Sequence, residues 1–433
     1  MTLDREWRRS TSDLISEGLL EIGDGYRAKN VELADSGIPF ARVQNLNTGF
    51  DFSGADLFPL SSIDRVGSKV SRPGDCVLTS KGSVGRVAFV SEGTPRFVYS
   101  PQLSYWRSLD SEVIHPLYLR YWLLGPEFIT QRDAVKGSTD MADYVNLRDQ
   151  RRMQITVPPI EVQRKIAAIL AAYDDLIENN SRRIQLLEEM TQRIYREWFV
   201  EFRYPGHEAA PLVDSELGPI PEGWLVGCIG DHADVFRGRS YRGVDVVEDG
   251  GVPFVNLKCL ERDGGFRTEG VKRYAGAFKA AHTVRVGDIV MAVTDMTQER
   301  RIVARAARIP RLNDEVGVFS MDLVKIVPSD VSAEYLLGLL SYSDFANRVK
   351  AYANGANVLH LHPDRISDFR MAFAPPEIEE RYAAVISPAQ DLADALLLTS
   401  VSLRATRDLL LPRLISGVVD VTDLDIALSE VAV

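Results

Sequence analysis

At 433 residues the chain exceeds what one ordinary hydrophobic core requires, so two domains or more are expected. Hydrophobic residues at 45% and charged residues at 26% are typical of a globular protein, and no apolar run approaches the roughly 20 residues that span a bilayer. The net charge of −11 argues against strong attraction to phosphate. However, residues 375–433 hold 10 acidic and 4 basic side chains, more than half of the acidic excess, which leaves the earlier segments nearly neutral.

The start of the chain and its cysteines give two further expectations. MTLDREWRRS carries charge with no apolar segment behind it, so we expect no secretory signal, no membrane association and a cytoplasmic protein. Cys76, Cys228 and Cys259 are odd in number, widely separated and in no CxxC pair. This spacing predicts neither a disulfide framework nor a thiolate metal site.

Residues 1–157 are predicted to form a first mixed α/β domain. GIPFARVQNL from Gly37 and RPGDCVLT around Gly74 and Asp75 indicate strands, the second entered through a Gly-Asp turn. HPLYLRYWLLG from His115 has helical spacing, and the Pro-Pro pair that begins at Pro158 ends the domain.

Residues 158–203 follow as a long helix with an apolar seam. Its seam positions fall at spacings of three and four: Val162, Ile166, Ile169, Tyr173, Leu176, Asn180, Ile184, Leu187, Ile194 and Trp198. A helix from Ile160 to Val200 would be about 60 Å long at about 1.5 Å per residue, longer than one turn of DNA. Asn180 is either a buried residue that fixes register or a surface residue.

Residues 204–374 repeat the first domain at an offset of 213 to 217. GVPFVNLKCL begins at Gly251, RVGDIVMA contains Gly287 and Asp288, and SAEYLLGLLS begins at Ser332. A second long helix is predicted over 375–417, with a tail over 418–433. Its seam is Tyr382, Val385, Ala389, Leu392, Leu396, Thr399, Leu403, Thr406, Leu410 and Leu414. Pro388 predicts a kink or break between Val385 and Ala389.

The sequence contains none of the enzyme motifs that we sought. The Pro-Pro pairs occur in VPPI and APPE, so the [ND]PP[FYW] turn of adenine methyltransferases is missing, and so is the GxxxxGK[ST] phosphate loop. None of the ten lysines has an acidic residue two positions earlier, as a common nuclease motif requires. His360 and His362 form an HxH pair without companions at metal-ligand spacing. We therefore expect no catalytic residues, no metal and no cofactor.

The two helical regions resemble those of type I restriction-modification specificity subunits. The stretch VPPIEVQRKIAAILAAYDDLIENNSRRIQLLEEMTQRIYREWFVEFRYPG, followed by LGPIPEGWLVGCIGD, is similar to the central conserved region of that family. TRDLLLPRLISGVVDV is similar to its distal conserved region. The resemblance implies an α+β protein with two target-recognition domains separated by two long antiparallel coiled-coil helices. Pro388 and EIEERYAAV, where the first helix has EVQRKIAAI, depart from the pattern.

The resemblance also implies a division of labour. Each recognition domain would read one half of a bipartite site in double-stranded DNA, and the helices would dock two methyltransferase subunits that use S-adenosylmethionine to methylate adenine. ATP-dependent restriction and translocase subunits would join for cleavage. The residues predicted to dock partners are Ile166, Ile169, Tyr173, Ile184, Leu187, Trp198, Leu392, Leu396, Leu403 and Leu410.

DNA contacts are predicted in the polar segments that follow the two Gly-Asp strands. The candidates are Ser80, Lys81, Ser83 and Arg86 in the first copy, and Thr294, Thr297, Gln298, Arg300, Arg301 and Arg305 in the second. Thr79 and Thr294 begin the two matched segments. Asn45 and Asn256 are further candidates. Each segment is alternatively a solvated hairpin with ordinary surface charge.

Two other functions fit the same pattern. The chain would then be the specificity module of a phage-defence methyltransferase that lacks a nuclease, or a coiled-coil scaffold whose repeated domains bind protein.

Overall fold

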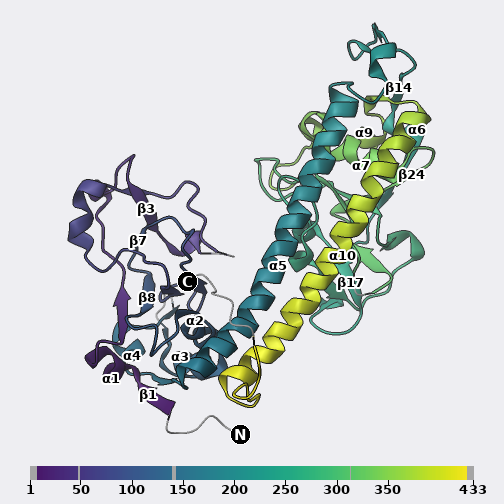
Figure 1. Ribbon diagram of the computed structural model, residues 1–433. Coiled ribbons are helices and arrows are strands. Elements are labelled where there is room, and N and C mark those ends of the chain that lie inside the picture. Colours follow the sequence, from purple (N-terminus) through teal and green to yellow (C-terminus); the bar gives the residue numbers. More distant parts are fainter. Residues whose placement is uncertain (1–6, 47–48, 139–142, 313, 427–433) are drawn as a thin grey trace. The chain divides into compact units, whose positions relative to one another are not determined.

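The computed structural model describes residues 7–46, 49–138, 143–312 and 314–426 (Figure 1). The chain divides into two compact units, Met1–Glu178 with Val401–Val433 (unit 1) and Asn179–Ser400 (unit 2). The predicted segments 1–157, 158–203, 204–374, 375–417 and 418–433 stay a prediction. The first six residues, on which part of the signal-peptide argument rests, and residues 427–433 of the tail lie outside the described residues.

Unit 1 is built on an antiparallel four-stranded sheet of order β2-β8-β5-β6 and a three-stranded sheet of order β4-β3-β7. The short strands β1 and β11 pair antiparallel, so residues 8–10 lie beside residues 154–156. The elements are β1 (Arg8–Ser10), α1 (Thr11–Ser16), β2 (Leu20–Asp24), β3 (Ile38–Ala41), β4 (Leu57–Phe58), β5 (Cys76–Thr79), β6 (Val87–Phe89), β7 (Val98–Tyr99), β8 (Leu103–Ser108), α2 (Pro116–Leu124), α3 (Pro126–Val135), β9 (Gly137–Ser138), β10 (Asp143–Tyr144), α4 (Leu147–Gln150) and β11 (Gln154–Thr156).

Unit 2 repeats this topology. Its antiparallel sheet has the order β15-β24-β20-β22, and the second sheet again joins two strands in parallel, β17 with β23, as β3 joins β7. The elements are β12 (Leu212–Val213), β13 (Ile220–Pro221), β14 (Leu225–Cys228), α6 (Ile229–His232), β15 (Ala233–Arg237), β16 (Val246–Val247), β17 (Val252–Val255), β18 (Lys272–Tyr274), β19 (Thr283–Val284), β20 (Ile289–Ala292), β21 (Thr294–Asp295), β22 (Ala306–Arg308), β23 (Gly317–Phe319), β24 (Leu323–Pro328), α7 (Ala333–Tyr342), α8 (Phe345–Val349), β25 (Leu359–His360), α9 (Asp364–Ser367) and β26 (Arg370–Phe373). The predicted duplication is confirmed.

The Gly-Asp motifs make the same turn in both copies. Gly74 has φ +87° and Gly287 has φ +90°, a region that glycine enters without steric cost. The carboxylate of Asp75 then accepts a hydrogen bond from the Arg72 amide at 2.8 Å, and that of Asp288 accepts one from the Arg285 amide at 2.9 Å. Each turn feeds a central strand whose residues are all buried, which explains why the motif recurs.

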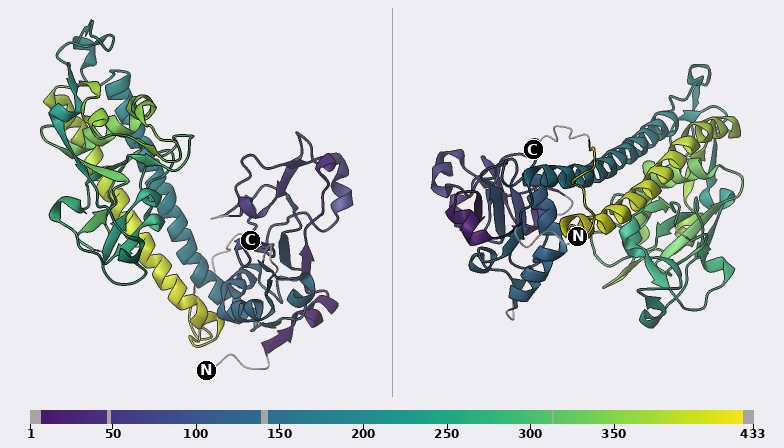
Figure 2. Two further views of the ribbon diagram at one scale, coloured as in Figure 1. Left: turned by 180° about the vertical axis from the view of Figure 1, so that it is seen from behind. Right: turned by 60° about the horizontal axis from the view of Figure 1, so that its bottom comes forward.

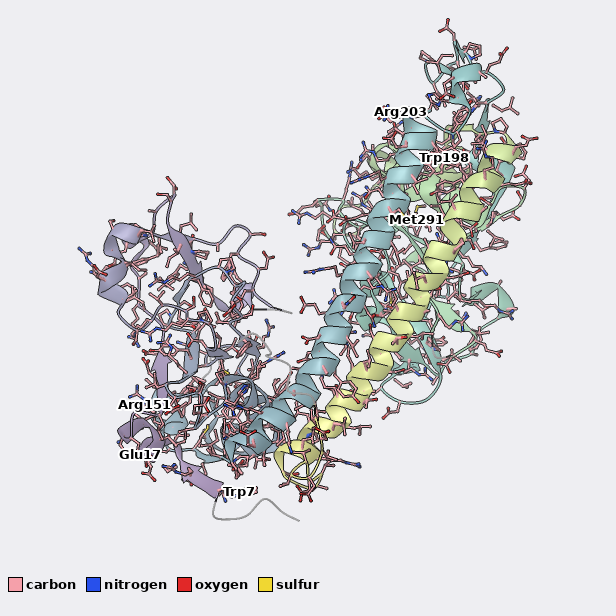
Figure 3. All side chains as sticks on the ribbon, in the orientation of Figure 1. Trp7, Glu17, Arg151, Trp198, Arg203 and Met291 are labelled. Atoms are coloured by element: carbon pink, nitrogen blue, oxygen red, sulfur yellow. The ribbon has the colours of Figure 1, made fainter. Side chains whose placement is uncertain are left out.

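Two long helices complete the fold and lie side by side in Figures 1 and 2. α5 spans Ile160–Tyr195 and continues as one π-helical turn, Arg196–Val200, and α10 spans Pro376–Ile415. In unit 1 the Asp174 carboxylate, early in α5, is 2.6 Å from the Arg407 guanidinium, late in α10. In unit 2 the ring centroid of Trp198, labelled in Figure 3, is 6.0 Å from that of Tyr382, early in α10. The helices are therefore antiparallel, and the predicted α+β fold is confirmed.

Of the kink or break predicted at Pro388, the break is wrong and the kink stays a prediction. α10 is one helix through this position, although Pro388 has no amide to donate to the preceding turn. Ile386 and Ala389, on either side, are buried in unit 2 while Pro388 itself is exposed. Packing on both sides of the proline holds the helix together where the backbone hydrogen bond is lost.

The predicted seams are only partly buried. Ile166 and Leu396 are buried. Asn180 is also buried, so of its two predicted positions, buried or on the surface, the buried one is correct. Leu176 and Leu392 are exposed by 52% and 40% instead. Each helix contributes residues to the core of unit 1 at one end and to the core of unit 2 at the other, and this places residues outside the strict heptad, such as Leu170 and Tyr195, in the cores.

One buried polar position at the start of the helices differs between the copies. The Gln163 side chain accepts a hydrogen bond from the His115 amide at 2.9 Å and donates to the carbonyls of Val113 and Pro158 at 2.9 and 2.7 Å. Glu379 takes the matching place in α10. It is buried and accepts a backbone hydrogen bond from Ser332.

Burial, with the nearby Asp330 carboxylate, raises the pKa of Glu379 from 4.5 to about 8. A neutral carboxyl can donate as well as accept, as the Gln163 amide does. Asp330 is itself 2.9 Å from the His232 ring.

We expect the stability of unit 2 to fall as pH rises from about 4.5 to about 8. An unfolded Glu379 ionises near 4.5 and the folded one near 8, so the neutral form stabilises the fold fully below the first value and is lost through the second. The slope approaches about 1.4 kcal/mol per pH unit. Glu379→Gln should remove this pH dependence. Hydrogen exchange of peptides from α7 and α10 at pH 5 and pH 8.5 measures this pH dependence of stability. Equal slopes for the unmodified protein and Glu379→Gln would contradict the role of Glu379.

Candidate nucleic-acid interface

The polar segment after β5 forms a short loop between two hydrogen-bonded strands. The Thr79 amide donates to the Arg86 carbonyl at 2.9 Å, and the Gly85 amide donates to the Thr79 carbonyl at 3.0 Å. The Thr79 hydroxyl accepts from the Arg86 amide at 2.9 Å. Residues 80–85 therefore form a loop with a fixed base, and Lys81, Ser83 and Arg86 are exposed.

The segment after β20 is a larger loop held from inside by one carboxylate. Asp295 is buried, and its oxygens accept from the amides of Thr297, Ile302 and Val303 at 2.8, 2.9 and 3.3 Å and from the Thr297 hydroxyl at 2.9 Å. Burial raises the pKa of Asp295, but these hydrogen bonds outweigh it and the net pKa is lowered. The carboxylate is thus the ordered centre of the loop.

Strand hydrogen bonds correct our alignment of the two loops. The Ala292 amide donates to the Arg305 carbonyl at 3.0 Å, as the Thr79 amide does to Arg86. Thr79 therefore matches Ala292, not Thr294, and Arg86 matches Arg305. Residues 80–85 correspond to residues 293–304, so the second loop is six residues longer.

The longer loop presents most of the residues predicted in the second copy. Gln298 is exposed and its amide donates to the Ala356 carbonyl at 3.1 Å, whereas Arg301 pairs with Glu299 at 2.7 Å. Arg300 has φ +53°, which turns the chain sharply beside them. Thr297 is exposed, while Arg305 lies at the loop base with its Nε 3.4 Å from the Arg301 carbonyl.

Two predicted contact residues point into the protein. Thr294 is buried in β21, with its hydroxyl 3.5 Å from the His360 ring, and the Ser80 hydroxyl donates to the Gln102 carbonyl at 3.1 Å. Sequence reasoning missed Met296, which is 70% exposed on the second loop and is apolar. Its exposure depends on the inserted residues, for which the first copy offers no counterpart.

The remaining candidates have structural roles. Asn45 and Asn256 are buried, and their side chains hydrogen-bond to nearby backbone groups. His362 has its Nε2 3.0 Å from an Arg237 nitrogen, whereas the His360 ring lies near Thr294. Within the described ranges, no group of three or more His, Cys, Asp or Glu residues is placed to hold a metal, and no helix is long and apolar enough to cross a membrane.

The residues predicted to dock partners divide into interior and exterior sets. Ile166 and Leu396 are buried, and most of the others are half-buried: Ile169, Tyr173, Ile184, Leu187, Trp198, Leu403 and Leu410. Leu392 is exposed. The exposed large apolar side chains of α5 and α10 are Leu176, Leu186, Met190, Val385, Leu392, Val401 and Leu409.

Comparison with known proteins gives a consistent result. Residues 17–189 match the type I restriction modification DNA specificity domain. The MjaIX specificity subunit of Methanocaldococcus jannaschii is 27% identical over 192 residues, 43% of this chain and 42% of that protein. The HindI specificity subunit of Haemophilus influenzae is 22% identical over 41% of this chain and 39% of its own length. The matches thus span about two fifths of these curated relatives.

The fold has a solved counterpart over almost its full length. The crystal structure of the type I restriction-modification S subunit from M. genitalium covers 96% of this chain and 98% of its own, with a TM-score of 0.56 and 12% identity. That likeness extends over the second unit, which the domain match reaches only at residues 179–189. Residues 17–189 thus carry the DNA specificity domain of type I restriction-modification systems, and the whole chain has the fold of a solved S subunit.

Proposed function

We propose that this chain reads a bipartite site in double-stranded DNA and performs no chemistry itself. The observation that carries the proposal is the duplicated loop: each copy places a polar segment after its Gly-Asp strand, with Arg86 and Arg305 at matching positions. Arginine at such a position can contact phosphate or pair with guanine through two hydrogen bonds.

The chain is acidic overall, which accords with a protein that binds DNA as part of a complex. A chain of net charge −11 gains little from general attraction to phosphate, so partners would supply part of the affinity. Two methyltransferase subunits that methylate adenine, joined by ATP-dependent restriction and translocase subunits, are the partners that the likeness to type I specificity subunits suggests.

Hydrogen exchange of the complex with its methyltransferase tests this proposal. We expect target DNA to slow exchange in residues 80–86 and in residues 293–305 together, because each loop covers one half of the site. The longer second loop should show the larger change. Protection of neither loop would contradict DNA reading. As the control, a duplex of unrelated sequence should leave the exchange of both loops unchanged.

We further propose that exposed apolar side chains of the helices dock the methyltransferase. The buried seam residues cannot do so, because they already pack inside their own units. Val385 and Leu392 are seven residues apart on α10, which places both on one side of the helix, and both are exposed. A partner that covers them removes apolar surface from water.

Val385→Glu with Leu392→Glu should weaken methyltransferase binding. The expected loss is about 1–2 kcal/mol for each residue, or roughly tenfold in affinity for each. Titration calorimetry with the purified methyltransferase measures it. Val244→Glu is the matched control, because Val244 is 77% exposed in unit 2 and belongs to the short turn Gly243–Asp245 and not to α5 or α10. Equal binding by the helix variant and the control would contradict docking on this face.

A further inference from the structure

Unit 1 contains a cavity beside the first loop, lined by polar and apolar residues. It has a volume of about 410 Å³ and is open to solvent on one side. Ser80 and Lys81, the first residues of the loop, line it together with Asp24 at the end of β2 and Tyr144 in β10. Ser104, in the middle of the sheet on β8, also lines it.

Ser104 is an unusual residue for this place. It is 1% exposed, and its hydroxyl has no hydrogen-bond partner among the described residues. An unpaired buried hydroxyl costs free energy, so a protein retains one where something else satisfies it. Ser104 lines the cavity although its hydroxyl is closed off from it, so a change of side-chain rotamer brings the hydroxyl to a group that enters there.

The second copy shows what the fold requires at this place. The pairing of β2 with β8 sets Asp24 opposite Ser104, and that of β15 with β24 sets Arg237 opposite Val324, so Ser104 matches Val324. The loop register matches Ser80 with Val293. Val293 and Val324 are both buried apolar residues. The fold is thus satisfied with valine at both positions, and the two serines of unit 1 are specific to its cavity.

The cavity favours a neutral ligand that both donates and accepts hydrogen bonds. An anion would meet the Asp24 carboxylate, which has one oxygen 2.8 Å from the Lys69 ammonium. An apolar ligand would leave the Ser104 hydroxyl unpaired. A nucleobase edge carries amino donors as well as carbonyl and ring-nitrogen acceptors. Lys81 is exposed at the cavity and is suited to the adjoining phosphate.

We propose that this cavity receives one nucleobase, turned out of the duplex, from the DNA half-site that unit 1 reads. The inference rests on the proposed function. Ser104 and Asp24 hydrogen-bond the base edge, and Lys81 holds the backbone from which the base is turned. The energy for unstacking comes from these contacts, as in enzymes that bind extruded bases. Unit 2, with valine at both positions, extrudes no base at the matching place.

Base-analogue scanning of the complex with its methyltransferase tests the proposal. The target duplex carries 2-aminopurine at one purine or pyrrolocytosine at one cytosine, and permanganate probes each thymine. We expect one position in the first half-site, distinct from the methylated adenine, to gain several-fold in fluorescence or oxidation when the complex binds. Ser104→Val, which copies the second domain, should suppress this signal and leave the signal of the methylated adenine unchanged.

Three outcomes separate the claims. A shift assay that finds no specific DNA binding overturns the proposed function and the cavity together. Specific binding without any extruded base besides the methylated adenine overturns the cavity alone. An extruded base whose signal persists in both Ser104→Val and Ser80→Val also overturns it. The scan of the unmodified protein decides the matter even if a variant fails to fold.

Discussion

Asp295→Ala should disorder the second loop and remove recognition of the second half-site. The substitution leaves the amides of Thr297, Ile302 and Val303 without the acceptor that now binds all three. The exposed Thr297 amide can bind water instead, but a buried donor left unpaired costs about 1–3 kcal/mol, so the amides of Ile302 and Val303 would together cost the loop roughly 2–6 kcal/mol of local stability. The rest of unit 2 has its own core and should stay folded.

Specific DNA affinity of the complex measures the effect. A complex that loses one half-site should approach its affinity for unrelated DNA, a weakening of at least about 10³-fold. Asp295→Asn is the graded control: one amide oxygen can still accept from Thr297, but the new NH₂ group faces the amides of Ile302 and Val303. Asn should therefore fall between the wild type and Ala. Undiminished specific affinity in the Ala variant would refute the role of this loop.

The duplication was predictable because its signals are local and strong. A Gly-Asp turn requires glycine with positive φ and an aspartate that binds the turn amide, so Gly74 and Gly287 mark the same strand in both copies. The apolar spacing of the long helices is equally visible. Both features follow from short segments, and the fold could be assembled from them.

The register of the loops could not be predicted from residue types. An alignment by residue type matches Thr79 with Thr294. The backbone hydrogen bonds of the two loops show instead that Thr79 corresponds to Ala292. Six inserted residues shift everything after them until Arg305 regains the register. Insertions in surface loops cost little free energy, so the amino-acid composition does not indicate where they lie.

Burial along the helices was predicted only in part. A strict heptad drifts around a straight helix, and the true neighbours include the recognition domains as well as the other helix. Val385 and Leu392 therefore lie outside, and Leu170 lies inside a core with Trp122. The sequence shows which residues are apolar but not which of several partners covers them.

The cavity of unit 1 gave no sequence signal. Ser104 occupies a strand position that looks like ordinary alternation, and Asp24, Lys81 and Tyr144 come from segments far apart in the chain. Only the matched valine of the other copy identifies the serine as unusual. The repeat is thus most informative at the positions where its copies differ.

Exchange of one recognition domain should change one half of the DNA site and nothing else. Strands β1 and β11 pair at the two ends of residues 8–156, so residues 1–157 can be replaced at a junction outside the sheet. The replacement comes from a specificity subunit whose own target is known. α5 and α10 stay unchanged, which preserves the face proposed to dock the methyltransferase and the proposed spacing of the two halves.

Sequencing of methylated adenines in cells that carry the exchanged chain is the decisive measurement. Our account predicts sites in which the first half is that of the donor, while the second half and the spacer are those of the parent chain. Methylated sites with both halves altered, or with neither altered, would contradict independent reading by two duplicated domains.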